Sequence, residues 1–271
     1  MTIDRIAYPS GAVCGLALDH RDSLRVAART RDYPEDSASL RSLKTEIARG
    51  LASAASVVLL DTELGIDAMA ELGETPLVIP LEAQGYETVG KGRLTTLLSD
   101  VDPERAAALG AVGCKLLLPY RPDLADAARK QEETAAAVIA SCLAAGVLSI
   151  IEPFVYGEVP ALGATVVETA KRLARLGPDL LKLQYPGDAY YCARVTDVCG
   201  AVPWVLLGGG TNEETFLAQL RDACAAGARG YIVGRTAWDT ALITDVEARA
   251  RAIAGRAAFL ARCRAVVEAT P

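Results

Sequence analysis

Two lysines interrupt apolar runs of this sequence. Lys182 stands in the run LLKL, and Lys115 in the run CKLLL. An ammonium group is costly to remove from water unless carboxylates surround it or it loses its proton. A neutral lysine amine attacks a ketone, and a second ammonium together with partial desolvation lowers the pKa of such an amine. The pattern therefore predicts Schiff-base chemistry, with Lys182 as the candidate nucleophile and Lys115 as its neighbour.

Four carboxylates come at or near the ends of other apolar runs. They are Asp19, Asp61, Glu82 and Glu152. A carboxylate beside a Schiff base can take a proton from the substrate hydroxyl and later return a proton to the enamine, and Glu152 is the candidate for that work. Other readings stay open, because Asp19 and Asp61 are also suited to cap helices and Glu152 to form a salt bridge. Lys115 is also able to point outward between helices.

Short strand-like runs alternate with alanine-rich helical segments along the whole chain. Strands are predicted at 13–19, 56–61, 77–81, 112–118, 147–152, 179–184, 203–207 and 230–233. Helical periodicity is clearest over 37–54, 102–109, 124–144, 164–175, 212–225 and 246–269. No linker or low-complexity block divides these elements, so residues 1–271 are predicted to form one domain.

The strand-like runs are mostly apolar and do not alternate cleanly, which is typical of parallel strands covered on both faces. Glycine follows several helical segments, at 110, 146, 177 and 227, where it suits a left-handed helix end. Eight strands alternating with helices favour a closed (β/α)8 TIM barrel, with an open doubly wound sheet as the alternative. In a barrel the carboxyl ends of the strands meet at one face, so the lysines and carboxylates are predicted to converge there.

Glycines cluster after the last two predicted strands. Gly208, Gly209 and Gly210 follow the seventh strand, and Gly234 and Arg235 follow the eighth. Backbone N–H groups of these two loops form a recurring phosphate site in barrels, and an arginine adds a charge-assisted contact. We therefore expect an anion site here, although the three glycines by themselves would also suit a tight turn.

Composition excludes several classes of function. The net charge of −6 and the aromatic content of 5% argue against a nucleic-acid partner and an anionic membrane surface. No uncharged apolar stretch of about 18 residues or signal-peptide pattern is present, so no membrane span is expected.

The seven cysteines form no CxxC pair and predict unpaired thiols in the cytoplasm. His20 is the only histidine, which disfavours a histidine-based zinc site, and the predicted chemistry needs no metal or other cofactor.

Collinear motifs over nearly the whole chain resemble the class I tagatose-1,6-bisphosphate aldolase family, which includes sulfofructosephosphate aldolase. The matching stretches are ALDHRDSL (17–24), LLDTELGIDA (59–68), Gly85-Tyr86, GCKLLLPYRPD (113–123), IIEPFVYG (150–157), DLLKLQYPGD (179–188), PWVLLGGG (203–210) and GYIVGRTAW (230–238). The resemblance implies a (β/α)8 barrel that splits a ketose phosphate into dihydroxyacetone phosphate and an aldehyde. A homo-oligomer is expected by analogy with similar barrels.

The resemblance also implies roles for individual residues. It places the Schiff-base lysine at Lys182, the active-site acid at Glu152, the accessory lysine at Lys115 and the first-strand aspartate at Asp19. It places the substrate phosphate on the glycine loops that contain residues 208–210 and 234–235. Asp61 and Glu82, at the ends of two further strands, are predicted to contact the substrate.

Two positions depart from the family pattern. His20 replaces the glutamine that follows the first-strand aspartate, and Gln184-Tyr185 replaces a more acidic pair. We expect Gln184 to face the substrate, and His20 and Arg21 to contact a second phosphate, a sulfonate or a hydroxyl. A hydrogen bond where the following helix begins is the alternative for His20. The departures leave the aldehyde half of the substrate open.

Two alternatives to aldol cleavage also remain open. One is a Schiff-base barrel that catalyses isomerisation, dehydration or transaldol transfer, and the other is a sugar-phosphate-binding barrel without catalysis.

Overall fold

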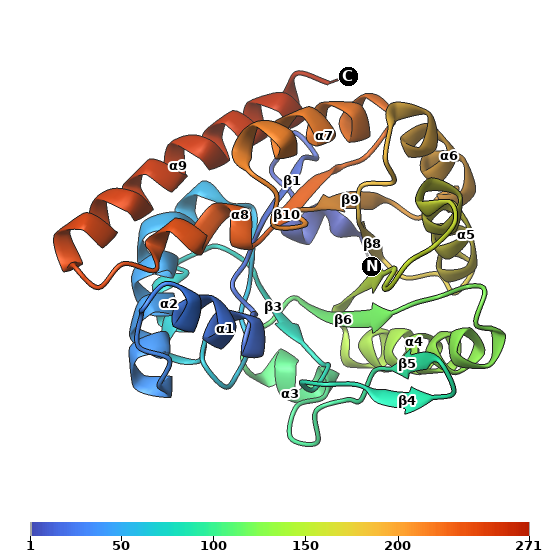
Figure 1. Cartoon of the computed structure of the whole chain (residues 1–271), viewed down its shortest axis with the longest axis horizontal. Helices are drawn as coiled ribbons and strands as arrows, with labels where there is room; N and C mark the ends of the chain where they lie inside the picture. Colours follow the sequence, from blue (N-terminus) through green and yellow to red (C-terminus); the bar gives the residue numbers. More distant parts are fainter. Residues whose placement is uncertain (1, 271) are drawn as a thin grey trace.

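Eight parallel strands close into a barrel in the computed structural model of the protein, which describes residues 2–270. Met1 and Pro271, the ends of the predicted domain, lie outside the described residues. The strands neighbour one another in the order β1-β10-β9-β8-β7-β6-β3-β2, and parallel pairing of β1 with both β10 and β2 closes the ring. Every strand of the ring has two neighbours, so the (β/α)8 prediction is confirmed and an open sheet is excluded. Figure 1 shows the strands around the centre of the molecule and the helices outside them.

Each of the eight predicted strand segments overlaps a barrel strand. The strands are β1 (Val13–Ala17), β2 (Val57–Leu59), β3 (Leu77–Pro80), β6 (Gly113–Pro119), β7 (Leu148–Phe154), β8 (Leu180–Leu183), β9 (Trp204–Leu207) and β10 (Gly230–Val233). Strand β7 runs two residues past its predicted end at Glu152. That extension places Phe154 within the barrel wall.

The helices largely follow the predicted periodic segments. They are α1 (Asp22–Thr30), α2 (Ser37–Leu51), α3 (Pro103–Ala108), α4 (Ala125–Ala145), α5 (Leu162–Ala174), α6 (Ala189–Cys199), α7 (Glu213–Ala225), α8 (Arg235–Trp238) and α9 (Val246–Glu268). Short 3-10 turns are η1 (Ile3–Ile6), η2 (Ala52–Ala54), η3 (Asp67–Glu71) and η4 (Asp239–Ala241). The glycines at 110, 146, 177 and 227 all have positive φ, as a left-handed helix end requires. Helices α1, α6 and α8 were not among the predicted segments.

A two-stranded hairpin between β3 and α3 was not predicted. It consists of β4 (Glu87–Val89) and β5 (Gly92–Leu94), which pair antiparallel. Gly90, in the turn, has φ of +59°, a conformation that glycine adopts without a Cβ clash. The segment Val89-Gly-Lys-Gly carries a turn signal of the kind that joins short hairpins. The hairpin lies beside α4 (Figure 1).

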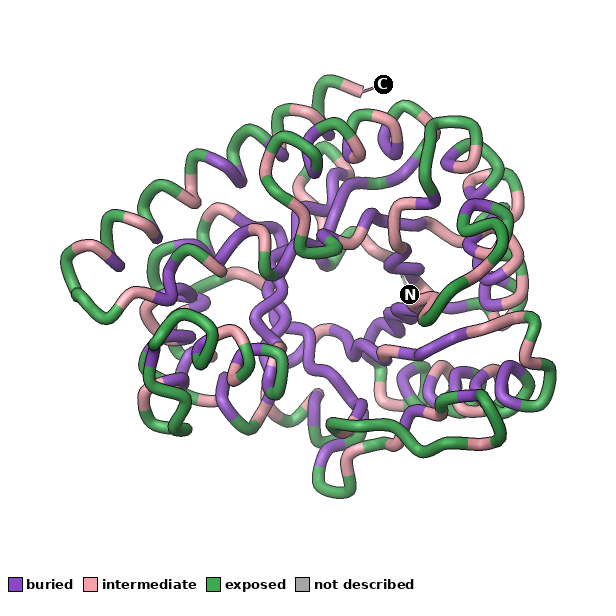
Figure 2. Tube along the Cα trace, viewed as in Figure 1, coloured by how far each residue is buried: buried purple, intermediate pink, exposed green. Residues whose placement is uncertain are grey.

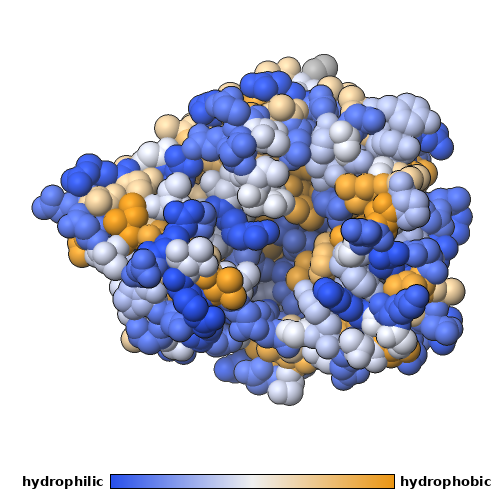
Figure 3. Space-filling model, in the orientation of Figure 1, coloured by the Kyte–Doolittle hydropathy of each residue, from blue (hydrophilic) through white to orange (hydrophobic). Residues whose placement is uncertain are grey.

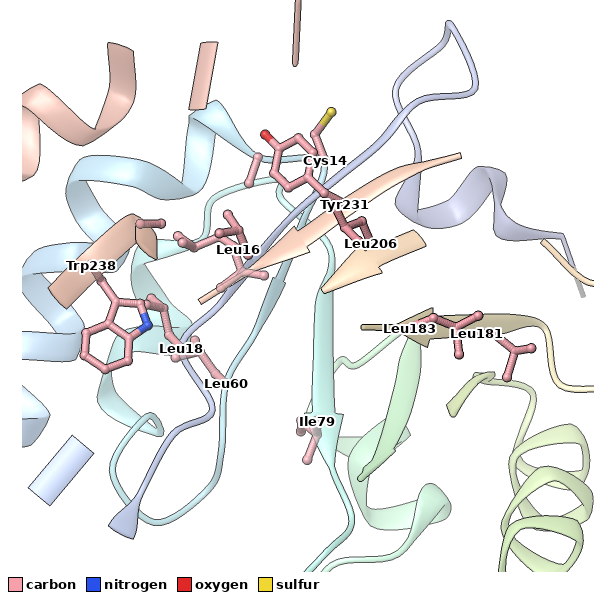
Figure 4. Close-up of a cluster of buried hydrophobic side chains, with 14 of the residues drawn as sticks. Cys14, Leu16, Leu18, Leu60, Ile79, Leu181, Leu183, Leu206, Tyr231 and Trp238 are labelled. Carbon is pink, nitrogen blue, oxygen red and sulfur yellow. The ribbon is translucent and has the colours of Figure 1, made fainter. Parts of the chain in front are cut away.

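The apolar core has two parts because successive strand residues face opposite sides of the barrel wall. One set fills the barrel and includes Val13, Leu59, Ile150 and Val205. The other set points outward and packs under the helices, as Leu16, Leu181 and Leu206 do in Figure 4. Figure 2 shows the strands as the continuous buried part of the chain.

The seven cysteines are buried and unpaired. Among residues 2–270, no helix combines the length and the apolar composition needed to cross a membrane.

Candidate active site

Strand periodicity brings the two lysines and Glu152 to one end of the barrel. In β8, Leu180 packs inside the barrel, so Lys182 two residues later faces the same way. In β7, Ile150 packs inside, and Glu152 follows it by two residues. Lys115 comes from β6, whose neighbours in the ring are β3 and β7.

One carboxylate oxygen lies close to both lysines. Glu152 Oε2 is 2.9 Å from Lys182 Nζ and 3.7 Å from Lys115 Nζ. The three side chains are buried, with Lys182 only 6% exposed. Glu152 is therefore placed to exchange a proton with the Lys182 amine or with a group bound to that amine.

Lys115 is surrounded by carboxylates. Its Nζ lies 2.5 Å from Glu82 Oε1 and 2.6 Å from Asp19 Oδ2, in addition to Glu152. Burial acts to lower the pKa of Lys115, but the carboxylates of Asp19, Glu82 and Glu152 outweigh it and raise that pKa well above its ordinary value. Lys115 therefore remains a cation at neutral pH, and it points into the site and not outward between the helices.

The two carboxylates that hold Lys115 differ from one another. Burial acts to raise the pKa of Asp19, but the ammonium of Lys115 and other nearby positive charges outweigh it and hold that pKa far below its ordinary value. Burial raises the pKa of Glu82, although Lys115 opposes the shift. Glu82 Oε2 also accepts the backbone N–H of Leu117 at 3.1 Å, which fixes the carboxylate beside Lys115. Asp19 is thus the more firmly ionised partner.

These groups line a cavity of about 550 Å³, a volume in the range of small-molecule sites. Asp19, Glu82, Lys115, Glu152 and Lys182 all contribute to its wall. Figure 3 shows the molecule hollowed near its centre in the orientation of Figure 1, with hydrophilic residues around the hollow. Within residues 2–270, no three His, Cys, Asp or Glu side chains are arranged to hold a metal ion.

His20 and Arg21 also line the cavity. His20 Nδ1 is 3.9 Å from Asp19 Oδ1 and has no hydrogen-bond partner among the described residues. The His20 ring lies edge-on to Trp238, with 5.1 Å between ring centroids. Burial lowers the pKa of His20 to about 3, so the imidazole is neutral near pH 7. Arg21 donates from Nη2 to the backbone carbonyl of Glu82 at 2.8 Å and lies 3.7 Å from the Glu82 carboxylate, while its buried Nε has no hydrogen-bond partner among the described residues.

The glycine loops meet at Arg235. A Cβ on Gly210, which has φ of +71°, would lie 3.0 Å from Arg235 Cζ, so the guanidinium lies against this glycine. Thr236 Oγ1 donates to the carbonyl of Thr211 at 2.8 Å and ties the start of α8 to the same loop. Asn212 accepts from the N–H of Thr215 at 2.9 Å and caps α7. Arg235, which follows β10, also lines the cavity. Its side chain therefore lies between the cavity and Gly210 in the loop after β9.

The predicted phosphate-loop glycines have two different surroundings. Gly209 and Gly210 are exposed. A Cβ on Gly208 would lie 2.8 Å from Val233 Cγ2, and a Cβ on Gly234 would lie 2.5 Å from His20 Cε1. Gly208 and Gly234 therefore allow close packing at the strand ends, and Gly234 makes room for the His20 ring.

Two side chains that were predicted to contact the substrate, Asp61 and Gln184, form contacts within the protein instead. The carboxylate of Asp61 forms a buried ion pair with Lys44 of α2 and accepts the N–H groups of Glu63 and Leu64, at 3.0 and 2.6 Å. Gln184 Oε1 accepts the N–H of Val155 at 2.7 Å. Neither side chain belongs to the cavity wall described above. Asp61 thus joins α2 to the end of β2, and Gln184 joins β8 to the loop after β7.

Three aromatic residues at the site were not predicted as functional. Tyr86 and Phe154 line the cavity, and Trp238 lies against His20. A period-two signal was available for Phe154, which follows Glu152 by two residues and so faces the same side of β7. Tyr86 lies in an irregular segment without periodicity, and its one signal was the Gly85-Tyr86 pair of the family resemblance.

Comparison with known proteins agrees with this arrangement. The model of the DeoC/LacD family aldolases matches residues 14–240, which include all eight barrel strands except the first residue of β1. The chain belongs to the DeoC/LacD aldolase family. It is therefore an aldolase whose two lysines and Glu152 share one cavity at the carboxyl ends of the strands.

A curated relative of this aldolase is a tagatose 1,6-diphosphate aldolase from Staphylococcus aureus (strain bovine RF122 / ET3-1). The two are 27% identical over 281 aligned positions that cover 91% of this chain and 86% of the relative. Among solved structures, an archaeal fructose-1,6-bisphosphate aldolase with its catalytic Lys covalently bound to the carbinolamine intermediate superposes with a TM-score of 0.68, at 19% identity over 98% of both chains. A Plasmodium falciparum fructose-bisphosphate aldolase gives a TM-score of 0.74 at 15% identity, over 96% of this chain and 93% of the other. These two structures share the barrel fold with this chain.

Proposed function

We propose that this aldolase forms a Schiff base between Lys182 and the carbonyl of a phosphorylated ketose, and cleaves the ketose into dihydroxyacetone phosphate and an aldehyde. The observation that carries the proposal is the position of Glu152 Oε2, which is 2.9 Å from Lys182 Nζ and 3.7 Å from Lys115 Nζ. A fixed cation, a nucleophilic amine and a proton-accepting carboxylate are what Schiff-base cleavage of a carbon–carbon bond requires.

The reaction begins when the neutral Lys182 amine adds to the ketone carbonyl and water leaves, which produces an iminium ion. A carboxylate then takes the proton from the hydroxyl on the carbon to be released. The carbon–carbon bond breaks, the aldehyde departs, and the electron pair of that bond forms an enamine. Protonation of the enamine and hydrolysis of the iminium release dihydroxyacetone phosphate and regenerate Lys182.

Glu152 is proposed as the group that moves these protons, because it is the carboxylate nearest to Lys182. Lys115 is proposed to supply a fixed positive charge to the substrate oxygens, and Asp19 to hold that lysine and meet a substrate hydroxyl. The phosphate of the donor half is proposed to bind Arg235 and the loop at Gly209 and Gly210. The relative named as a tagatose 1,6-diphosphate aldolase supports a ketose substrate of this class.

The test is borohydride reduction in the presence of dihydroxyacetone phosphate, followed by intact-protein mass spectrometry and peptide mapping. The expected result is one reduced adduct, on Lys182, that is missing from the Lys182→Met variant. An adduct on another lysine would reassign the nucleophile. Binding of the ligand without any adduct would replace the aldolase mechanism by a binding role.

A cytoplasmic location and a homo-oligomeric state complete the proposal. The seven buried, unpaired cysteines support a reducing compartment. Val246 leaves 65% of its surface exposed beside Ala250 and Ile253, in a groove between α2 and α9 that supports a contact between copies. Sedimentation equilibrium tests the second point, and a monomer at all protein concentrations would contradict it.

A further inference from the structure

Arg21 links two segments at the mouth of the barrel. It stands directly before α1, and its side chain extends to the segment after β3, where Nη2 donates to the carbonyl of Glu82 at 2.8 Å. The N–H of Asp22 donates to Gln84 Oε1 at 3.1 Å and forms a second link between the same segments. Since β2 lies between β1 and β3 in the ring, both links span the end of β2.

The Arg21 guanidinium is almost fully buried against Glu82. Arg21 belongs to the cavity wall, but only 3% of its surface is exposed. Its Nη2 lies 3.7 Å from Glu82 Oε1, and its buried Nε has no partner among the described residues. Burying a guanidinium with an unpaired N–H costs folding free energy, so stability alone does not account for an arginine at this position.

Glu82 in turn influences how Lys115 is shared among three carboxylates. Lys115 Nζ lies 2.5 Å from Glu82 Oε1 and 2.6 Å from Asp19 Oδ2. Its distance to Glu152 Oε2 is 3.7 Å, which is too long for a hydrogen bond. Because Glu82 and Asp19 hold the ammonium on their side of the cavity, Glu152 remains available for the proton transfers proposed for it.

The charges around Glu82 oppose one another. Burial raises the pKa of Glu82, and the positive charge of Lys115 opposes that shift; Asp19 adds to the shift, and Arg21 opposes it. Arg21 and Lys115 therefore both favour the ionised form of Glu82. A protonated Glu82 would hold Lys115 less strongly, and the ammonium would then be drawn toward the remaining carboxylates, Glu152 among them. The charged and titratable groups around Glu82 and its lysine partner are Asp19, Arg21, Tyr86, Lys115 and Glu152.

We propose that Arg21 is a positioning residue of this aldolase, which acts through Glu82 to keep Lys115 apart from the proton-transferring carboxylate. That carboxylate, Glu152, is then free to exchange protons with the Schiff base. The proposal rests on the aldolase function proposed above. It assigns Arg21 an indirect role, whereas the sequence led us to expect contact with the substrate.

The readout is the exchange of one proton of dihydroxyacetone phosphate with solvent, followed by NMR in deuterium oxide. Once the ketone has formed an iminium ion on Lys182, Glu152 takes a proton from the adjacent carbon that carries the hydroxyl group, and the electron pair of that C–H bond forms the enamine. Glu152 exchanges this proton for a solvent deuteron and returns the deuteron to carbon. Exchange therefore reports proton transfer by Glu152 without any aldehyde.

The variants are Arg21→Gln, Arg21→Lys, which keeps the charge, and a matched control, Arg29→Gln, which removes an exposed arginine from α1. At pH 7 and saturating dihydroxyacetone phosphate, we expect Arg21→Gln to slow exchange at least about tenfold. Arg21→Lys is expected to exchange at least about threefold faster than Arg21→Gln, and Arg29→Gln to stay within about twofold of the wild type, because its charge is exposed and screened.

The pH profile of exchange distinguishes this role from a merely structural one. The wild-type rate is expected to fall on acidification as Glu82 gains a proton. In Arg21→Gln the fall is expected to begin roughly 0.5–1.5 pH units higher, because the variant lacks one of the positive charges that favour ionised Glu82. A loss of the same size at every pH would overturn the proposal.

A double variant tests whether Arg21 acts through Glu82. Adding Arg21→Gln to Glu82→Gln is expected to change the exchange rate by less than about twofold, since residues that act as one unit are not additive. Circular dichroism checks that each variant folds. Additive losses would contradict an action through Glu82, and a loss confined to low concentrations of dihydroxyacetone phosphate would place Arg21 on the substrate.

Glu82→Gln keeps the proposal open to refutation if Arg21→Gln does not fold, because exchange by Glu82→Gln at the wild-type rate would by itself overturn it. In each of these outcomes, a borohydride-reduced adduct on Lys182 of the wild type leaves the aldolase function standing. Absence of that adduct from the wild type would instead remove the function itself.

Discussion

The two lysines of the cavity have different partners, although both extend from neighbouring parts of the barrel wall. Lys115 meets Asp19 and Glu82 within 2.6 Å, whereas Glu152, at 2.9 Å, is the only ion-pair partner of Lys182 among residues 2–270. A lysine held by several carboxylates stays protonated, and this suits Lys115 to be a fixed charge. Lys182, beside Glu152, is therefore the lysine proposed to act as the nucleophile.

Replacing Lys182 tests its proposed role as the nucleophile. Lys182→Met is expected to lower turnover by roughly 10³-fold or more, the scale of loss when a nucleophile is removed, while circular dichroism stays that of the wild type. The apolar stem of methionine fills the same space, so the barrel is expected to fold. Lys130→Met, on the exposed face of α4, serves as the matched control and is expected to retain full activity. Turnover by Lys182→Met at the wild-type rate would contradict the Schiff-base assignment.

His20 predicts a specific pH dependence of stability. Burial lowers its pKa to about 3 from an ordinary value of 6.5, so the folded protein binds the His20 proton less readily than the unfolded chain does. The stability associated with neutral His20 is therefore complete above pH 6.5 and is lost as the pH falls toward 3. Between pH 7 and 5, this amounts to a loss of about 1–2 kcal/mol in the free energy of unfolding.

Urea unfolding of wild type and His20→Asn at pH 7 and pH 5 measures this effect. The chain has no other histidine, so the variant is expected to lose less stability on acidification than the wild type, by the same 1–2 kcal/mol. Equal losses in the two proteins would show that His20 titrates normally in the folded state.

At the level of elements, helix α2 is joined to the barrel by a buried ion pair. Lys44 of α2 and Asp61 after β2 are 2% and 0% exposed. Breaking a buried pair leaves an uncompensated charge, which costs more than replacing both partners. The pair therefore sets where α2 lies against the end of β2.

Lys44→Met is expected to lower the free energy of unfolding by about 3 kcal/mol, because it leaves the Asp61 carboxylate buried with backbone N–H donors alone. The double variant Lys44→Met/Asp61→Asn removes both charges and keeps an acceptor oxygen, so it is expected to lose less than half as much. Urea unfolding at pH 7 provides the measurement. A double variant less stable than the single one would contradict a penalty from the unpaired charge.

At the level of the whole molecule, closure of the barrel depends on the seam between the first and last strands. Val13 of β1 pairs with Gly230 of β10. Gly230 has φ of +132°, and a Cβ there would lie 2.0 Å from the carbonyl oxygen of Val13. Only glycine allows the two strands to approach this closely.

Gly230→Ala is expected to destabilise the protein by at least about 3 kcal/mol, since it adds backbone strain to a steric clash at the seam. Gly255→Ala is the control, because Gly255 lies in α9 with open space around its Cβ position, and a gain of about 0.5–1 kcal/mol is expected there. Thermal unfolding compares the two. A Gly230→Ala variant as stable as the wild type would show that the seam can adjust.

The sequence alone determined the kinds of elements and their order. Apolar runs separated by periodic, glycine-ended segments predicted eight strands and a barrel, because strand and helix periodicities are local properties of the chain. The same local periodicity placed Lys115 and Lys182 inside two predicted strands and Glu152 at the end of a third, and these strands converge in a barrel. Those residues do share one cavity.

The tertiary structure alone decided which polar groups pair with one another. Asp61 was predicted at the substrate and instead meets Lys44, and Gln184 instead accepts the Val155 N–H, because each lies near a donor from a distant part of the chain. Periodicity specifies the face on which a side chain lies, but contacts between separate elements depend on how those elements pack in three dimensions.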